Sequence, residues 1–239
     1  MSLENFISLQ RFTASRWGRF VLPALGSLAV WHALAWVFLL VENEREMGAV
    51  QRVFYFHVAS AFVTYTLVGV MLVSALGYLS TKKWQWDLVG YAAASVGFLF
   101  CTIVLLSGMI WGHSAWNTWW RWEPRLVSFL VLWLVFFSLI FLRRVTEGEG
   151  QQANLSAVLS ILAAVNVPIV IFSIKLLSHA EQLHPEVIGR QGLRDVSFYY
   201  GLLASVVALH LLAVWLWWVK LTELLLCREV DRRIAERED

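Results

Sequence analysis

The sequence predicts an all-α integral membrane protein with six transmembrane helices and both chain ends on the inner side of the membrane. Hydrophobic residues make up 59% of the chain and charged residues only 15%, and the mean hydropathy is +0.64. A soluble globular domain is about 45–50% apolar and about 25% charged. The composition therefore excludes an ordinary soluble domain, and the lack of a basic stripe in the sequence argues against a nucleic-acid partner.

Six apolar runs are each long enough to cross a hydrocarbon core, which requires roughly 20 residues of helix. They cover residues 21–41, 53–79, 87–110, 125–142, 154–177 and 198–220. The preceding segment, 1–20, lacks an apolar centre and carries three arginines, so we expect a cytoplasmic surface segment rather than a cleavable signal peptide. The charged segment 221–239 is expected to extend the last helix as a cytoplasmic tail. We treat residues 1–239 as a single six-helix domain.

The charges on the connections indicate the orientation of the helices. With the N-terminus inside, twelve of the 19 Lys and Arg residues lie on the inner side and seven on the outer side. An excess of Lys and Arg is typical of cytoplasmic connections. The resulting N-in, C-in arrangement leaves three extracytoplasmic connections, at residues 42–52, 111–124 and 178–197.

The connection 111–124, between the third and fourth helices, is unusually rich in tryptophan. It holds five of the 14 tryptophans of the chain, namely Trp111, Trp116, Trp119, Trp120 and Trp122. An aromatic belt needs only one or two tryptophans per helix end, so five together favour a flat platform for a large planar ligand such as haem. A short interfacial helix would place Trp116, Trp119, Trp120 and Glu123 on one face, because their spacing is i, i+3, i+4, i+7.

Charged residues and a proline border this connection. Pro124 suits the first turn of the fourth helix, and Glu123 suits the positive end of that helix. Arg121 and Arg125, together with Arg52 and with Arg190 or Arg194, are candidates to pair with the propionates of a haem. Solvated interface charge is an equally good interpretation of each.

Two histidines lie on the same predicted face as the tryptophans. His57 lies about one turn into the second helix, and His184 lies in the longest outer connection. Two neutral imidazoles commonly hold a haem iron from its two faces. The alternative is that His57 packs within the bundle while His184 is solvated. His179 and His113 are rival ligands on this face.

A second pair, His32 and His210, is predicted near mid-depth of the first and last helices. Polar residues inside a bilayer are costly and tend to be functional, so this pair could bracket a second haem. Hydrogen bonding to neighbouring helices is the interpretation we favour. The two cysteines, Cys101 and Cys227, form no CxxCH motif, so any bound haem would be non-covalent.

The segment WGHSAWNTWWRWEPRLV resembles WGxxWGxxWxWDxRLT, the tryptophan-rich signature of the cytochrome c assembly superfamily of haem-handling proteins. The length, the six spans, FYFHVASA at 54–61 and LHP at 183–185 resemble the haem exporter protein C family within it. The resemblance covers roughly residues 20–220. The chain departs from the usual pattern at four positions, which are Ala59 for proline, Asn117 for glycine, Glu123 for aspartate and Val127 for threonine.

The resemblance implies that His57 and His184 are the axial ligands of a non-covalent haem b on the periplasmic face of a bacterial inner membrane. It also implies a haem-presenting platform formed by Trp111, Gly112, Trp116, Trp119, Trp120, Trp122, Glu123, Arg125 and Leu126. The segment before His184 is a few residues longer than usual, which leaves His179 as a substitute ligand.

The resemblance further implies that haem passes to a periplasmic haem chaperone for cytochrome c maturation. The implied partners are the ATPase and membrane subunits of an ATP-binding cassette (ABC) transporter complex, and a small membrane subunit is left open. The sequence has no GxxxxGK[ST] loop, so we expect a non-enzymatic subunit whose ATPase is a partner. The alternatives are a haem lyase or a membrane cytochrome b using His32 and His210, and a transporter of another small molecule.

Overall fold

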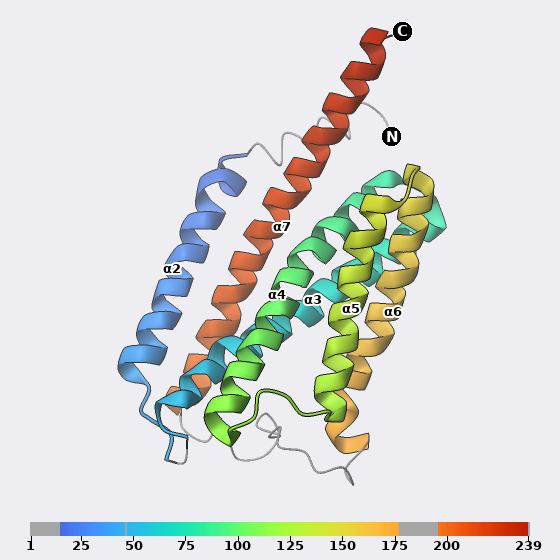
Figure 1. The fold of residues 1–239 in the computed structure, drawn as a ribbon. Helices are drawn as coiled ribbons and strands as arrows, with labels where there is room; N and C mark the ends of the chain where they lie inside the picture. The colour runs from blue at the N-terminus through green and yellow to red at the C-terminus, as the bar shows by residue number, and fades with distance from the viewer. Residues whose placement is uncertain (1–14, 46, 177–195, 239) are drawn as a thin grey trace.

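A computed structural model describes residues 15–45, 47–176 and 196–238, and Figure 1 shows them as a bundle of long helices. The long helices are α2 (Leu22–Ala35), α3 (Arg52–Thr81), α4 (Trp84–Trp116), α5 (Pro124–Val145), α6 (Glu149–Leu176) and α7 (Val196–Glu238). Short helical segments flank the first two, at η1 (Trp17–Val21), η2 (Trp36–Leu40) and η3 (Ala49–Gln51). Within these described residues, six helices are long and apolar enough to cross a membrane, which agrees with the predicted all-α class and six spans.

The connections of the bundle gather at its two ends. Figure 1 shows the connection from α2 to α3 and the connection 117–123 from α4 to α5 at the same end, where α6 ends and α7 begins. The connections 82–83 and 146–148 lie at the opposite end, together with the last turns of α7. The tryptophan-rich segment therefore shares its end of the bundle with the beginning of α3, which carries His57.

Glycines of α4 permit close contact with α3 and α5. A Cβ at Gly90 would stand 3.0 Å from Cβ of Ser74 on α3. Gly97 of α4 leaves no room for a side chain, since a Cβ there would stand 2.6 Å from Cε1 of Phe136 on α5. Large side chains such as Phe100 and Met71 fill the remaining space, at 1% and 0% exposure. Small residues at helix contacts are the usual means of close approach between membrane helices.

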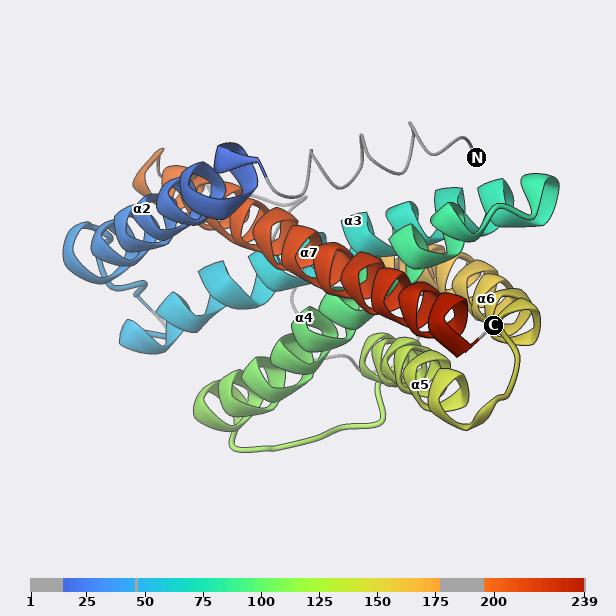
Figure 2. The same cartoon turned by 90° about the horizontal axis from the view of Figure 1, so that it is seen from above.

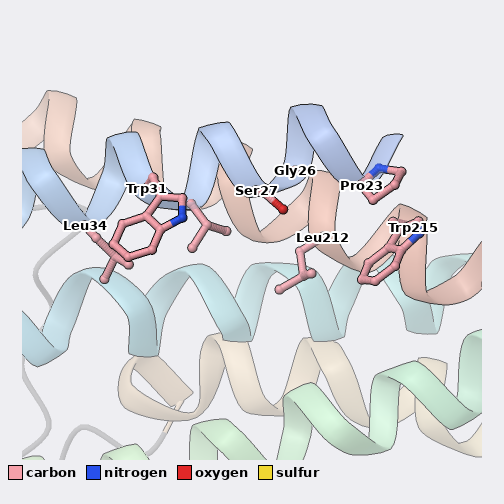
Figure 3. Close-up of a pocket in the computed structure, with 8 residues that line it drawn as sticks. Pro23, Gly26, Ser27, Trp31, Leu34, Leu212 and Trp215 are labelled. Carbon is pink, nitrogen blue, oxygen red and sulfur yellow. The ribbon is translucent and has the colours of Figure 1, made fainter. Parts of the chain in front are cut away.

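Helix α2 packs on one flank of α7, and Figure 2 shows α7 crossing the bundle between α2 and α4–α5. Gly26 lies at this contact, where a Cβ would stand 3.7 Å from the backbone nitrogen of Leu212, an ordinary van der Waals distance. Figure 3 shows an apolar groove along this contact, lined by residues that include Trp31, Leu34, Leu212 and Trp215.

An ion pair joins α4 and α5 at the end opposite the tryptophan-rich segment. Arg143 donates two hydrogen bonds to the carboxylate of Asp87, one of them at 3.0 Å between Nη2 and Oδ2, and a further one to Ser156 on α6 at 3.1 Å. The guanidinium also lies 4.2 Å from the ring centre of Tyr91. This network holds the ends of α4, α5 and α6 together.

The prediction of a short helix through Trp116, Trp119, Trp120 and Glu123 is wrong. Helix α4 continues to Trp116, and Asn117 then adopts a left-handed conformation with φ 52°, its N–H donating to the His113 carbonyl at 2.9 Å. Such a residue ends a helix. Residues 117–123 are not helical, and Glu123 in extended conformation leads into Pro124, the first residue of α5. The predicted start of this helix at Pro124 is confirmed.

Helix α7 runs without interruption to Glu238, so the charged segment continues the last helix. Two contacts of Arg228 attach the first part of this charged segment to the rest of the bundle. Arg228 forms a bidentate salt bridge with Glu149, with two hydrogen bonds of 2.9 Å. Its guanidinium also lies 4.5 Å from the ring centre of Trp84.

Candidate functional site

His57 lies five residues after the start of α3 and is 9% exposed. Its Nδ1 lies 3.0 Å from Oγ of Ser107 on α4. Its Nε2 makes no hydrogen bond to any residue that the structure describes. The Val104 backbone also interacts with the ring. An imidazole with one nitrogen held and the other without a hydrogen bond could serve as a metal ligand.

The surface of α4 that faces His57 is shaped by Gly108 and Trp111. A Cβ at position 108 would stand 3.1 Å from Cε1 of His57, so a larger residue there would require the imidazole to shift. The indole of Trp111 meets the imidazole edge to face, with ring centres 5.7 Å apart. Sequence reasoning missed Ser107 and Gly108; their place one turn before Trp111, on the same helix face, was the available signal.

The five tryptophans form three groups. Trp111 is 3% exposed, packs with Phe54, and lies 5.8 Å from Trp116 between ring centres. Trp119 stacks on His113 at 4.1 Å and 8°, and Trp120 meets Trp122 edge to face at 5.7 Å. Trp111 therefore belongs to the core beside His57, whereas the other pairs lie along the end of α4 and the connection.

Exposed indoles and buried polar atoms without partners occur together at the end of α4 and in the connection that follows it. Trp119 is 54% and Trp122 77% exposed. Nε1 of Trp120 and Nδ1 of His113 are buried, and in the part of the chain that the structure describes neither has a hydrogen-bond partner. Buried polar atoms are nearly always satisfied, so Trp120 and His113 offer two positions at which a bound group could add a hydrogen bond.

Gly112 and Glu123 hold the two ends of the connection. A Cβ at Gly112 would stand 3.1 Å from the Thr118 carbonyl oxygen, so this glycine lets the chain after Asn117 pass close to α4. Glu123 is 5% exposed and lies 3.6 Å from Nε of Arg121.

The arginines contact backbone carbonyls of neighbouring segments. Arg125 donates to the carbonyls of Val170 at 3.4 Å and Ile171 at 3.2 Å, near the end of α6. Arg52 donates to the carbonyls of Val37 at 3.1 Å and Val41 at 3.3 Å. Val41 directly follows the last residue of η2, and a cation such as Arg52 is favourable there because the helix dipole is negative at its C-terminal end.

A family model for heme exporter protein C matches residues 3–236 of this chain. The chain belongs to the haem exporter protein C family. This match confirms the family that the tryptophan-rich signature predicted, and it covers nearly the whole chain.

Curated relatives in this family agree with the match. The chain is 33% identical to the "Heme exporter protein C" of Bradyrhizobium diazoefficiens over 177 residues, which is 73% of this chain and 66% of that protein. It is 36% identical to the protein of the same name from Paracoccus denitrificans over 132 residues, 55% of this chain and 54% of the relative. It is 29% identical to the "Heme exporter protein C" of Escherichia coli K12 over 140 residues, which is 59% of this chain and 57% of that protein. The chain thus spans 54–66% of the length of these relatives.

In this member of the haem exporter protein C family, the structure does not place His32 and His210 at one depth. His32 contacts Tyr200, with 2.9 Å between Nε2 and the hydroxyl, whereas the segment beside His210 packs near Gly26. His32 and Gly26 are six residues apart on α2, a rise of roughly 9 Å at about 1.5 Å per residue. The expectation of similar depth is therefore wrong.

Hydrogen bonds occupy both ring nitrogens of His210. Nδ1 lies 2.8 Å from the Val206 carbonyl, which accepts, and Nε2 lies 3.0 Å from the hydroxyl of Thr66. This agrees with the interpretation that His210 bonds to a neighbouring helix. The groove in Figure 3 has no histidine among its lining residues.

The remaining predicted ligands, His184 and its rival His179, lie outside the described residues, as does most of the connection 178–197.

Proposed function

We propose that this chain binds haem non-covalently at the end of the bundle formed by residues 117–123 and the start of α3. Haem then passes to a periplasmic haem chaperone for cytochrome c maturation. Membership of the haem exporter protein C family supports haem as the cargo. The proposal concerns a haem-delivery subunit of the bacterial inner membrane that does not itself catalyse a reaction.

The observation that carries this proposal is the arrangement of His57. Its Nδ1 is held by Ser107, while Nε2 has no hydrogen-bond partner among the described residues. An imidazole nitrogen with an available lone pair is the commonest axial ligand of haem iron. His184 is the proposed ligand on the opposite face of the haem.

The chemistry of the neighbouring segment fits a haem. The exposed indoles of Trp119 and Trp122 offer apolar faces to a flat macrocycle. The buried, unsatisfied Nε1 of Trp120 and Nδ1 of His113 offer polar positions for propionates or for a partner chain. In the family these tryptophans, with Gly112, Glu123 and Arg125, would present the haem.

Release of haem needs a source of energy outside this chain. The sequence holds no phosphate-binding loop of the GxxxxGK[ST] type. We therefore propose that an ABC transporter complex supplies the ATPase and a further membrane subunit, and that the periplasmic chaperone receives the haem.

The test is haem retention by the purified full chain, co-expressed with its haem chaperone and measured as the pyridine haemochrome. We expect a b-type spectrum with about one haem per chain. His57→Ala and His184→Ala should each lower retention by about tenfold or more, because each removes an axial ligand. His32→Ala is the matched control, since this histidine contacts Tyr200 at another place in the bundle.

Full retention in both His57→Ala and His184→Ala would overturn the ligand assignment. Haem lost only in His32 or His210 variants would favour the alternative, a membrane cytochrome b or haem lyase. Absence of haem in the wild-type chain under all conditions would overturn the haem function itself.

A further inference from the structure

We propose that Ser107 is a positioning residue that fixes the tautomer of His57 and so presents Nε2 to the haem iron. This inference rests on the proposed function, because it concerns how one of its ligands is oriented. It assigns a specific role to a residue of α4 that lies outside the tryptophan-rich signature.

The argument begins with the single proton of the Ser107 hydroxyl. Its Oγ lies 2.6 Å from the Ile103 carbonyl oxygen, one turn back on the same helix. Two oxygens approach this closely only when a hydrogen lies between them, and a carbonyl can only accept. The hydroxyl proton is therefore committed to Ile103.

Oγ also lies 3.3 Å from the Val104 carbonyl oxygen, which likewise can only accept. The contact of the hydroxyl with His57 must then be as an acceptor. Oγ lies 3.0 Å from Nδ1 of His57, so Nδ1–H donates to it. A neutral imidazole carries one N–H, and when it is on Nδ1 the lone pair is on Nε2. The Ile103–Ser107–His57 chain of hydrogen bonds thus selects the tautomer that can bind a metal through Nε2.

Two neighbours keep the imidazole in line with this hydrogen bond. Gly108 faces Cε1 and Nδ1, where a Cβ would stand at 3.1 and 3.7 Å. Trp111 contacts the ring edge to face, at 64° between planes. Because these contacts restrict rotation of the ring, loss of the hydroxyl is expected to disturb mainly the tautomer and the direction of the Nε2 lone pair.

The neutral hydroxyl has a further consequence for release. A carboxylate behind a ligating histidine raises the basicity of the ligand, whereas a serine hydroxyl does so less because it carries no charge. A ligand of this kind suits a protein that must give up its haem. The Ser107 hydroxyl would therefore both orient His57 and keep its bond to the haem weak enough for release.

The tautomer can be measured before any haem is bound. Full-length chain with 15N-labelled histidine, reconstituted without haem in lipid nanodiscs, should show a protonated Nδ1 and an unprotonated Nε2 for His57, assigned by comparison with His57→Gln. Ser107→Ala should convert this signal into a mixture of tautomers. A His57 signal with Nε2 protonated in the wild-type chain, or one unchanged by Ser107→Ala, would overturn the inference.

The haem-loaded chain supplies the second readout. Ser107→Ala should weaken haem retention by about tenfold, the lower end of the range for partners of metal-ligating histidines, and change the low-spin signal of the ferric iron. Ser107→Thr should restore both, because a threonine hydroxyl can also donate to the carbonyl four residues back. Ser95→Ala is the matched control, since Ser95 donates to the Tyr91 carbonyl at 2.9 Å on the same helix, three turns away.

The two proposals fail in different ways. If His57→Ala keeps its haem, the proposed function loses its ligand. If His57→Ala loses haem while Ser107→Ala keeps the wild-type affinity and iron signal, the ligand stands and the role of Ser107 is wrong.

Discussion

Gly108 and His57 meet so closely that a Cβ atom at position 108 would stand 3.1 Å from Cε1 of the imidazole. This distance is tighter than ordinary van der Waals contact, so any side chain at position 108 must displace the ring. The backbone of α4 at Gly108 therefore limits the position of the His57 imidazole on α3.

We expect Gly108→Ala to lower haem retention by about tenfold, because a small displacement of the ring moves its ligating nitrogen. Gly108→Val should lower it further, since the branched side chain is larger. The measurement is haem per folded chain, by pyridine haemochrome. Gly69→Ala is the control: this glycine has nothing within 4 Å of an added Cβ, and alanine there should keep the haem and stabilise α3 by up to about 1 kcal/mol. Equal haem content in Gly108→Ala and Gly69→Ala would contradict the prediction.

The tryptophans should separate into structural and ligand-facing residues. Trp111→Ala removes a buried side chain of the core beside His57, and the free energy of unfolding should fall by about 3–5 kcal/mol. Trp122 is 77% exposed, so Trp122→Ala should change stability by no more than about 0.5 kcal/mol while it slows haem transfer to the chaperone. Thermal unfolding in detergent and a stopped-flow transfer assay measure the two effects. An equal loss of stability in both variants would refute this division.

Thr66 and His210 should behave as an interhelical hydrogen bond rather than as part of a haem site. We expect His210→Leu to retain haem, because both ring nitrogens already have partners in the bundle. A double-mutant cycle with Thr66→Val should give a coupling free energy of about 0.6 kcal/mol, and of at most about 1.7 kcal/mol. Loss of haem in His210→Leu at unchanged stability would instead return His210 to the list of ligands.

The ion pair of Asp87 and Arg143 should affect stability without affecting haem. Its side chains are 10% and 11% exposed, and removal of one partner from a buried pair typically costs about 3–5 kcal/mol. Asp87→Asn should therefore lower the unfolding temperature strongly, and Asp87→Asn combined with Arg143→Gln should cost less than the sum of the single changes. Haem content per folded chain should stay at the wild-type value, because the pair lies at the end opposite the tryptophan-rich segment (Figure 1). Additive effects would mean that the two charges stabilise the bundle independently.

Several features of the fold followed directly from local sequence. Long apolar runs predicted six helices of sufficient length, and Pro124 predicted the first residue of α5. Both depend on properties of a short segment alone, namely its transfer free energy and its backbone geometry. The family could be predicted for the same reason, since the tryptophan-rich signature is one contiguous segment.

Other features depended on contacts between segments. The end of α4 was placed too early, because the spacing of the tryptophans suggested a separate helix; the left-handed conformation of Asn117 and the approach of Thr118 to Gly112 decide where the helix stops. Their positions within the apolar runs 21–41 and 198–220 predicted a similar depth in the membrane for His32 and His210. The contact of His32 with Tyr200 shows where α2 lies against α7.

By itself, the sequence determined the six apolar runs that form helices long enough to cross a membrane in the described residues, the family of the chain, and His57 as a candidate ligand. These are properties of composition, length and contiguous motif. Only the tertiary structure decided that Ser107 and Gly108 hold the imidazole, that Trp111 is part of the core, and that Arg125 donates to a carbonyl of α6. The physical reason is that each of these depends on the relative shift of two packed helices, and one residue of shift rotates a side chain by about 100° and moves it by about 1.5 Å.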